Sequence, residues 1–318
     1  MRIGLDVMGG DRAPDATIRG AILAHKTIKQ YGEIVLIGDE QIIRDKLEEF
    51  EVSPDDFVIV HAEQTIHMGE NPTKAYKLKT KSSINVGFQL LKEGEIQAFS
   101  SAGNSGAMLV GSMYSVKPVK GITRPATAAI FPRQDGGNNI ILDVGTNVDV
   151  KPEHLFQFAI LGNLYAHYVF HIERPRVGLL NIGEEKEKGN FVTKSAYPLL
   201  ENSKTFNFVG NVEGRELLRD HADVIVCDGF TGNVVLKQTE AFFRILTKRG
   251  LSDDYLSRFN YENYGGTPVL GVNAAVMLGH GISNDVAIKN MILHACEVHK
   301  ADLPSRIENS ILKNFHNE

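Results

Sequence analysis

The chain has 318 residues, of which 42% are hydrophobic and 23% are charged. This composition is typical of a globular protein and argues against a disordered one, and the length fits either two domains or one large α/β unit. The formal net charge of -5 argues against a general surface for nucleic acid.

The two cysteines, Cys227 and Cys296, lie far apart within apolar runs, and neither belongs to a CxxC or a Cys/His metal spacing. We therefore expect buried thiols in a reducing compartment and no metal site. The chain begins with the strand-like run Arg2 to Val7 and shows no secretory signal pattern. The most apolar helical stretch, His154 to Phe170, is interrupted by polar residues. These features predict a cytoplasmic protein.

Short β-branched runs alternate along the chain with segments of helical periodicity. The predicted strands are Arg2 to Val7, Ile34 to Ile37, Phe57 to Val60, Ile96 to Ser100, Ile140 to Val144, Val177 to Asn181, Phe206 to Val209 and Val224 to Cys227. The predicted helices include Asp15 to Tyr31, Ser83 to Lys92, Pro152 to Phe170 and Asn233 to Lys248. This alternation indicates a three-layer αβα fold with a mainly parallel sheet.

No clear linker divides this pattern. The loosest stretches, Gln134 to Asn139 and Gly250 to Thr267, are not rich enough in Pro, Ser or charge to mark a domain boundary. We therefore expect residues 1–318 to form a single compact α/β domain.

Loops of small residues follow the predicted strands. They read MGGD, AGNSG, GTN, IGEE and DGFTGN in chain order. In a parallel sheet such loops lie at the carboxyl edge, where open α/β folds bind ligands. Small residues let the backbone approach a ligand, and helix N-termini offer N–H groups to an anion. The loops predict one crevice for a phosphate or an oxyanion, although ordinary turns and helix caps explain any one of them alone.

The motifs of nucleotide sites and of protein nucleophiles are absent. The sequence contains no GxGxxG followed by an acid, no GxxxxGK[ST], no GxSxG and no HExxH. A nucleotide cofactor is therefore not indicated. If the bound anion is itself the nucleophile, no protein nucleophile is needed. Phosphate that attacks a thioester requires positioning, donors for the developing oxyanion and exclusion of water.

Ordered motifs along nearly the whole chain resemble one family. They are DVMGGDRAPD, SAGNSGA, LDVGTNVD, LLNIGEEKEKG, FVGNVEG, DVIVCDGFTGNVVLK and YGGTPVLGVN, and they are similar to the signatures of the PlsX family of acyl-ACP:phosphate acyltransferases. The resemblance implies transfer of a long-chain fatty acyl group from acyl carrier protein to inorganic phosphate, giving acyl phosphate for phospholipid synthesis without a cofactor. It also implies a homodimer and a fold akin to the isocitrate/isopropylmalate dehydrogenases and the phosphate acetyltransferases.

One segment departs from the family pattern. The family carries a helical hairpin linked to dimerisation and membrane association, and the corresponding excursion at 234–263 looks shortened between Lys237 and Tyr261. The resemblance implies peripheral contact with the inner face of the cell membrane and a glycerol-phosphate acyltransferase partner. The shortened segment argues against the membrane contact. The amphipathic helix here also fits packing on its own core or on a dimer mate.

The phosphate site is predicted from the loops. The residues expected to bind phosphate or acyl phosphate are Asn104, Ser105, Gly106, Asn147, Gly229, Thr231, Gly232, Asn233, Gly9, Gly10 and Asp11. Two sets of these residues lie where helices are predicted to begin, and helix capping alone is their alternative interpretation. They are Asn104, Ser105 and Gly106, and Gly229, Thr231, Gly232 and Asn233.

Three residues are the catalytic candidates. Lys188 matches the family motif and would neutralise phosphate or a tetrahedral oxyanion, although its EEKEKG run also fits a solvated charged loop. Asp228 would orient amides or take a proton from phosphate, and a cap explains it almost as well. His280 would donate to an oxyanion, and a structural role is its alternative.

A separate surface is expected to meet the acidic acyl carrier protein. Lys74, Lys77, Lys79 and Lys81 lie close together in KAYKLKTK, and such a patch steers an acidic partner. A solvated charged face is the alternative. For the whole protein, the alternatives are a short-chain phosphotransacylase that uses acyl-CoA and a non-catalytic acyl-carrier-binding scaffold. An NAD-dependent dehydrogenase is disfavoured because no adenine or ribose signature is visible.

Overall fold

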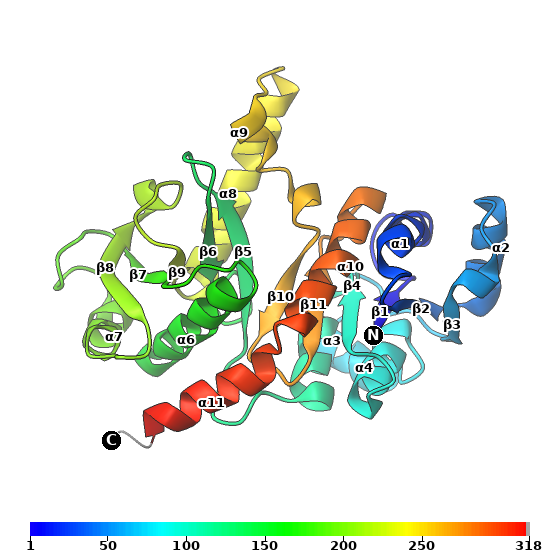
Figure 1. Cartoon of the computed structure of the whole chain (residues 1–318), viewed down its shortest axis with the longest axis horizontal. Coiled ribbons are helices and arrows are strands. Elements are labelled where there is room, and N and C mark those ends of the chain that lie inside the picture. Colours follow the sequence, from blue (N-terminus) through cyan, green and yellow to red (C-terminus); the bar gives the residue numbers. More distant parts are fainter. Residues whose placement is uncertain (316–318) are drawn as a thin grey trace. The chain divides into compact units, whose positions relative to one another are not determined.

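The computed structural model describes residues 1–315, which divide into two compact units. Unit 1 comprises Met1–Lys117 and Tyr261–Lys300, and unit 2 comprises Pro118–Asn260 and the chain from Ala301 onward. Each unit contains mainly parallel strands flanked by helices (Figure 1). The predicted α/β fold class is therefore confirmed, whereas the interpretation of residues 1–318 as a single domain stays a prediction.

The strands of unit 1 pair in an order that differs from their order in the chain. Along the sheet they are β3 (Val58–His61), β2 (Glu33–Gly38), β1 (Arg2–Asp6), β4 (Ala98–Ser101), β11 (Ala275–Gly279) and β10 (Gly266–Leu270). They pair in parallel except β10, which is antiparallel to β11. The helices of this unit are α1 (Asp15–Ile28), α2 (Glu40–Glu49), α3 (Pro72–Leu78), α4 (Ser83–Glu93), α5 (Ser105–Gly111) and α10 (Asp285–Lys300).

Helices cover both faces of these strands. On one face α1 packs against α10, and a Cβ at Gly20 would lie only 2.5 Å from the Cβ of Ile288, so the close approach of the two helices requires glycine there. On the other face Phe99 of β4 meets Phe88 of α4 edge to face, with ring centroids 5.2 Å apart. Both rings are fully buried, and burial of a Phe side chain contributes roughly 1.5–3 kcal/mol.

The strands of unit 2 follow the same plan. Along the sheet they are β5 (Ala126–Pro132), β6 (Asn138–Leu142), β9 (Val224–Val226), β7 (Arg176–Asn181) and β8 (Asn207–Glu213). They pair in parallel except β5, which is antiparallel to β6. The helices are α6 (Pro152–Tyr168), α7 (Phe191–Glu201), α8 (Gly229–Lys248), α9 (Asp254–Ser257) and α11 (Leu303–Phe315).

Successive residues of β6 show how its two faces are covered. Leu142 lies against Gly162 of α6, where a Cβ would approach the Leu142 side chain to 2.8 Å. Its neighbour Ile141 belongs to the cluster into which Val235 and Leu236 of α8 pack. Because adjacent residues of a strand point to opposite faces, α6 and α8 cover opposite sides of this sheet.

The predicted strands form with small shifts of their ends, but three strands were missed. They are β5, β10 and β11. The sequence of β5 is rich in alanine and ends in Pro132, and β10 contains Pro268. Neither composition is typical of a strand, so pairing with β6 and β11 overrides the local preference.

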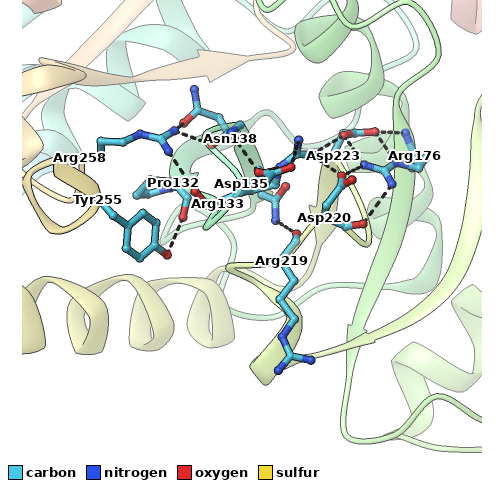
Figure 2. A network of polar contacts seen from close by, with 12 residues as sticks. Pro132, Arg133, Asp135, Asn138, Arg176, Arg219, Asp220, Asp223, Tyr255 and Arg258 are labelled. Atoms are coloured by element: carbon cyan, nitrogen blue, oxygen red, sulfur yellow. Dashed lines mark hydrogen bonds and ion pairs between the residues drawn. The ribbon is translucent and has the colours of Figure 1, made fainter. Parts of the chain in front are cut away.

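Arg258 and Tyr255 fix the chain after α8 to the β5–β6 hairpin (Figure 2). The Arg258 guanidinium donates to the carbonyl oxygens of Arg133 at 3.0 Å and Gly137 at 2.5 Å. The Tyr255 hydroxyl donates to the carbonyl oxygen of Pro132 at 3.2 Å. Part of the stretch from Gly250 to Thr267, which looked loose in the sequence, is therefore held by specific hydrogen bonds.

The same network continues to a carboxylate at the amino edge of the sheet. Asp223 accepts from the Arg133 guanidinium at 3.0 Å and from the Arg176 guanidinium at 2.9 and 3.0 Å (Figure 2). Burial raises the pKa of Asp223, but the hydrogen bonds from Arg176 outweigh burial and hold that pKa below its ordinary value. The charged pair thus ties the starts of β7 and β9 together.

Candidate active site

The loops that follow β1, β4 and β11 lie side by side at the carboxyl edge of unit 1, because these strands are parallel neighbours. The Asp11 N–H donates to the carbonyl oxygen of Gly281 at 2.7 Å. A Cβ at Gly9 would lie 2.7 Å from the backbone nitrogen of Gly103, and Gly10 has a φ of 110°. Glycine at these positions permits the close approach of the backbones.

A buried carboxylate lies beneath these loops. Asp6, at the end of β1, is 1% exposed, and it accepts from the Ser101 hydroxyl at 2.7 Å and from the Met8 N–H at 3.1 Å. Burial raises the pKa of Asp6, and the hydrogen bond from Ser101 opposes that rise. Since the Ser101 hydroxyl also accepts from the Gly103 N–H at 3.0 Å, Asp6 and Ser101 hold the first loop against the loop that precedes α5.

Asn104 uses its carboxamide within the protein. Its oxygen caps α5 by accepting from the Ala107 N–H at 3.0 Å. Its nitrogen donates to the carbonyl oxygens of His67 and Glu70 at 3.1 Å and of Met68 at 3.3 Å. The side chain therefore anchors the segment 67–70 beside the first turn of α5, and its role toward phosphate stays a prediction.

The next residues in this turn present backbone donors. Ser105 is exposed at the first position of α5, and Gly106 follows it, with Pro72 so close that a Cβ would lie 2.8 Å away. Among the interactions within residues 1–315, the N–H groups of Ser105 and Gly106 have no acceptor. The donors that this turn leaves open are thus backbone N–H groups rather than the Asn104 carboxamide, and their role toward phosphate stays a prediction.

His280 lies at the same edge, one residue beyond β11. Its ring is half-buried, with its centroid 5.3 Å from that of Tyr261. The structure thus brings His280 to the loops of Asp11 and Asn104 in unit 1, as the strand order requires. A catalytic role of His280 stays a prediction.

In unit 2 the central feature is Asp143, directly after β6, which the sequence analysis did not single out. It is fully buried. One carboxylate oxygen accepts from the Thr127 N–H at 3.0 Å and hydroxyl at 2.9 Å, and the other accepts from the Asn147 N–H at 2.6 Å and carboxamide at 2.8 Å. The signal that could have identified Asp143 in the sequence is an acid at the carboxyl end of a buried strand, in LDVGTN. In the structure its carboxylate holds the loop after β6 in place.

Asn147 therefore has no amide proton left over. Its carboxamide nitrogen donates to Asp143 and to the carbonyl oxygen of Pro125 at 2.8 Å. The backbone carbonyl oxygen of Asn147 accepts from the Gly229 N–H at 2.7 Å. The loop after β6 is thus bonded to the first turn of α8, and a direct contact of the Asn147 side chain with phosphate stays a prediction.

The start of α8 is capped internally. Asp228 accepts from the Thr231 N–H and hydroxyl, each at 2.8 Å, and its carbonyl oxygen accepts from the Gly232 N–H. The cap interpretation of Asp228 is confirmed, and a catalytic role is untested. Within the described part of the chain, the Phe230 N–H has no acceptor, so this turn offers that donor to a ligand.

Two further residues shape the same turn. Gly232 packs against the carbonyl of Asp143 with no room for a side chain. Asn233 donates from its carboxamide to the carbonyl oxygen of Val144 at 3.4 Å, which is a weak hydrogen bond. Cys227, just before the turn, is buried as predicted, and burial raises its thiol pKa well above the usual range.

Lys188 lies on the exposed loop between β7 and α7. Its stem crosses Gly183, where a Cβ would lie 2.9 Å from the Cγ of Lys188. The neighbouring Lys186 pairs with Glu201, and Arg215 pairs with Glu184 and Glu213. Within residues 1–315 the Lys188 ammonium has no ion pair, so its charge is available to an anion.

The lysines predicted to dock the carrier protein differ in their surroundings. Lys79 pairs with Glu70 at 2.6 Å and donates to the carbonyl oxygen of Thr65 at 2.8 Å. Lys81 pairs with Glu63 at 2.8 Å. Lys74 and Lys77, on α3, are exposed and have no acidic partner among the described residues. The structure thus leaves Lys74 and Lys77 as the cations available to a partner.

Two searches of residues 1–315 gave negative results. None of the helices there combines the length and the apolar character that crossing a membrane requires. In the same residues, no group of three or more His, Cys, Asp or Glu side chains is arranged to hold a metal ion.

Comparisons with known proteins agree with the motifs. The family model described as fatty acid synthesis protein matches residues 1–306. The phosphate acyltransferase of Halothermothrix orenii is 42% identical, over 98% of this chain and 99% of the relative. The phosphate acyltransferase of Geobacter sulfurreducens is 40% identical, over 99% of this chain and 95% of the relative. The predicted family resemblance is confirmed.

Solved structures confirm the fold independently of sequence. A phosphotransacetylase from Streptococcus pyogenes superposes with a TM-score of 0.63 at 15% identity, over 94% of each chain. A branched-chain phosphotransacylase from Enterococcus faecalis superposes with a TM-score of 0.62 at 13% identity, over 94% of this chain and 99% of that one. The chain therefore belongs to the PlsX-like family of fatty acid synthesis proteins and is a phosphate acyltransferase.

Proposed function

We propose that this enzyme transfers a long-chain fatty acyl group from acyl carrier protein to inorganic phosphate and forms acyl phosphate for phospholipid synthesis. The observation that carries the proposal is an exposed cation on the loop after β7 of unit 2, the Lys188 ammonium, which has no ion pair among residues 1–315. Burial raises the pKa of the Cys227 thiol, which disfavours the thiolate and therefore attack by this residue. In this proposal phosphate is the nucleophile.

The reaction needs one bond formed and one broken. A phosphate oxygen attacks the carbonyl carbon of the thioester, and the C–O bond of the acyl phosphate forms as the C–S bond breaks. The proton of hydrogen phosphate passes to the sulfur of the departing carrier. In this proposal Lys188 neutralises the anion, and the open N–H of Phe230 in the same unit stabilises the developing oxyanion.

The identity of the donor is the finer part of the proposal. The resemblance of the motifs favours acyl carrier protein, and the exposed Lys74 and Lys77 on α3 suit its acidic surface. We further propose that the enzyme works in the cytoplasm as a homodimer and passes acyl phosphate to a glycerol-phosphate acyltransferase at the membrane. The relatives named above support the acyltransferase chemistry and leave the donor to experiment.

The test incubates the purified protein with palmitoyl-acyl carrier protein and inorganic phosphate and traps acyl phosphate as a hydroxamate with hydroxylamine. We expect hydroxamate that depends on phosphate and that sulfate does not replace. Acetyl-CoA and palmitoyl-CoA serve as alternative donors in parallel reactions. Hydroxamate from acetyl-CoA alone would assign a short-chain phosphotransacylase instead, and no hydroxamate from any donor would overturn the proposal.

A further inference from the structure

Large apolar side chains are exposed on the loops at the carboxyl edge of unit 2. Val148 is 56% exposed, Ile182 is 80% exposed, Phe191 is 81% exposed and Phe230 is 62% exposed. We call these four residues the apolar rim. Other apolar side chains of this unit are exposed as well, including Val234, Phe242 and Ile245 further along α8. The apolar rim is the part of this exposed surface that lies at the loops predicted to bind the anion.

The strand order places the apolar rim along one edge. Val148 follows β6, Phe230 follows β9 and Ile182 follows β7, and these three strands are consecutive and parallel in unit 2. The hydrogen bond from the Gly229 N–H to the Asn147 carbonyl oxygen, at 2.7 Å, brings the residues next to Phe230 and Val148 into contact. Half of the rim is therefore joined directly to the first turn of α8.

The other half is joined to the loop of Lys188. The Ile182 N–H donates to the Asn181 carboxamide oxygen at 2.9 Å, and the nitrogen of the same carboxamide donates to the carbonyl oxygen of Lys188 at 3.1 Å. Phe191 begins α7 three residues after Lys188. The loop thus carries apolar side chains at both of its ends and an available ammonium between them.

This arrangement suits an amphiphile with an anionic or carbonyl head and a hydrocarbon tail. The Phe230 N–H and the Lys188 ammonium are open to the head, and the apolar rim offers surface to the tail. We propose that the apolar rim binds the acyl chain of the substrate beside the reacting carbonyl. This inference rests on the proposed function and makes the rim the determinant of chain length.

The test compares donors of different length in rim variants and in a matched control. Ile182→Ser and Phe191→Ser remove large side chains from the rim, while Leu199→Ser removes an exposed side chain, 41% accessible, from the far end of α7. We expect each rim variant to raise KM for palmitoyl donors about tenfold, because each side chain loses most of its contact with the chain. We expect the KM of the rim variants for butyryl donors to stay unchanged, and the KM of Leu199→Ser to stay unchanged for both palmitoyl and butyryl donors. Ile182→Leu, which keeps a large apolar side chain, should have the wild-type KM for palmitoyl donors.

Several results would overturn the inference. They are an equal effect on both donor lengths, no effect on either, a change in molar mass by light scattering, or a loss of flotation with anionic vesicles. The third result assigns the rim to contact with a second copy, and the fourth to a lipid surface. If the wild-type enzyme forms no acyl phosphate from any donor, the proposed function fails and the rim loses its basis. If the wild type is active and the variants are unchanged, only the rim inference fails.

Discussion

Asn147 donates to one oxygen of Asp143 twice, through its backbone N–H at 2.6 Å and through its carboxamide at 2.8 Å. This pair fixes both the path of the loop after β6 and the orientation of the Asn147 side chain. The loop in turn accepts the Gly229 N–H of α8. A buried carboxylate therefore sets the position of the first turn of α8.

Removal of this carboxylate should destabilise unit 2. Asp143→Ala leaves the Thr127 and Asn147 donors buried without an acceptor, and we expect a loss of about 3 kcal/mol in the free energy of unfolding. Thr127→Val removes one hydroxyl donor and should cost about 1 kcal/mol. Urea unfolding followed by circular dichroism measures both. Equal stability of Asp143→Ala and the wild type would show that water satisfies the abandoned donors.

Asn104 should reveal two separable functions. Asn104→Ser keeps an oxygen that caps α5 but cannot reach the carbonyl groups of segment 67–70, whereas Asn104→Ala loses both. We expect the alanine variant to lose about 1 kcal/mol more than the serine variant, which is the usual contribution of an N-cap. Thermal unfolding gives the difference, and limited proteolysis at segment 67–70 should accelerate in both variants. Resistance of that segment in both would contradict its anchoring by Asn104.

The stability of unit 1 should depend on the ionisation of Asp6. Because burial raises the folded-state pKa of Asp6 above its ordinary value of 3.8, the native state binds the proton more tightly than the unfolded state. The resulting stability is fully present below pH 3.8 and is lost as pH rises through the folded pKa. Asp6→Asn should remove this loss. Urea unfolding at a series of pH values, for both proteins, tests the difference; parallel curves would contradict it.

Lys188 should matter for the reaction rather than for folding. Its ammonium is exposed and has no ion pair among residues 1–315, so Lys188→Met should leave the unfolding midpoint unchanged. We expect kcat/KM for phosphate to fall roughly a hundredfold, as for other lost oxyanion contacts. Lys194→Met, on α7, is the control for charge. A similar loss in both variants would point to a general field effect instead.

The carrier surface should discriminate among its lysines. Lys74→Glu with Lys77→Glu should raise KM for acyl carrier protein about tenfold at low salt, and the effect should shrink as salt increases. Lys81 is already paired with Glu63. Lys81→Glu therefore serves as a control for added negative charge, and it should raise the KM for acyl carrier protein less than the double variant does. Steady-state kinetics at two salt concentrations provide the test. An effect independent of salt would argue against electrostatic docking.

The sequence by itself determined the alternation of strands and helices, the family and the loops of small residues. Apolar runs such as Val177 to Asn181 become strands because their pattern matches a sheet covered on both faces. The alanine-rich β5 and the proline-containing β10 needed partners to become strands, and local composition does not identify those partners.

Only the tertiary structure decided how the polar side chains of the loops are used. Asn104 and Asn147 fit a phosphate cradle in the sequence, yet their amide protons are committed to carbonyl groups and to Asp143. Those acceptors lie at least four residues away along the chain, and most lie more than 20 away, so spacing alone does not reveal them. The physical reason is that buried polar groups pair with whatever the fold brings within reach.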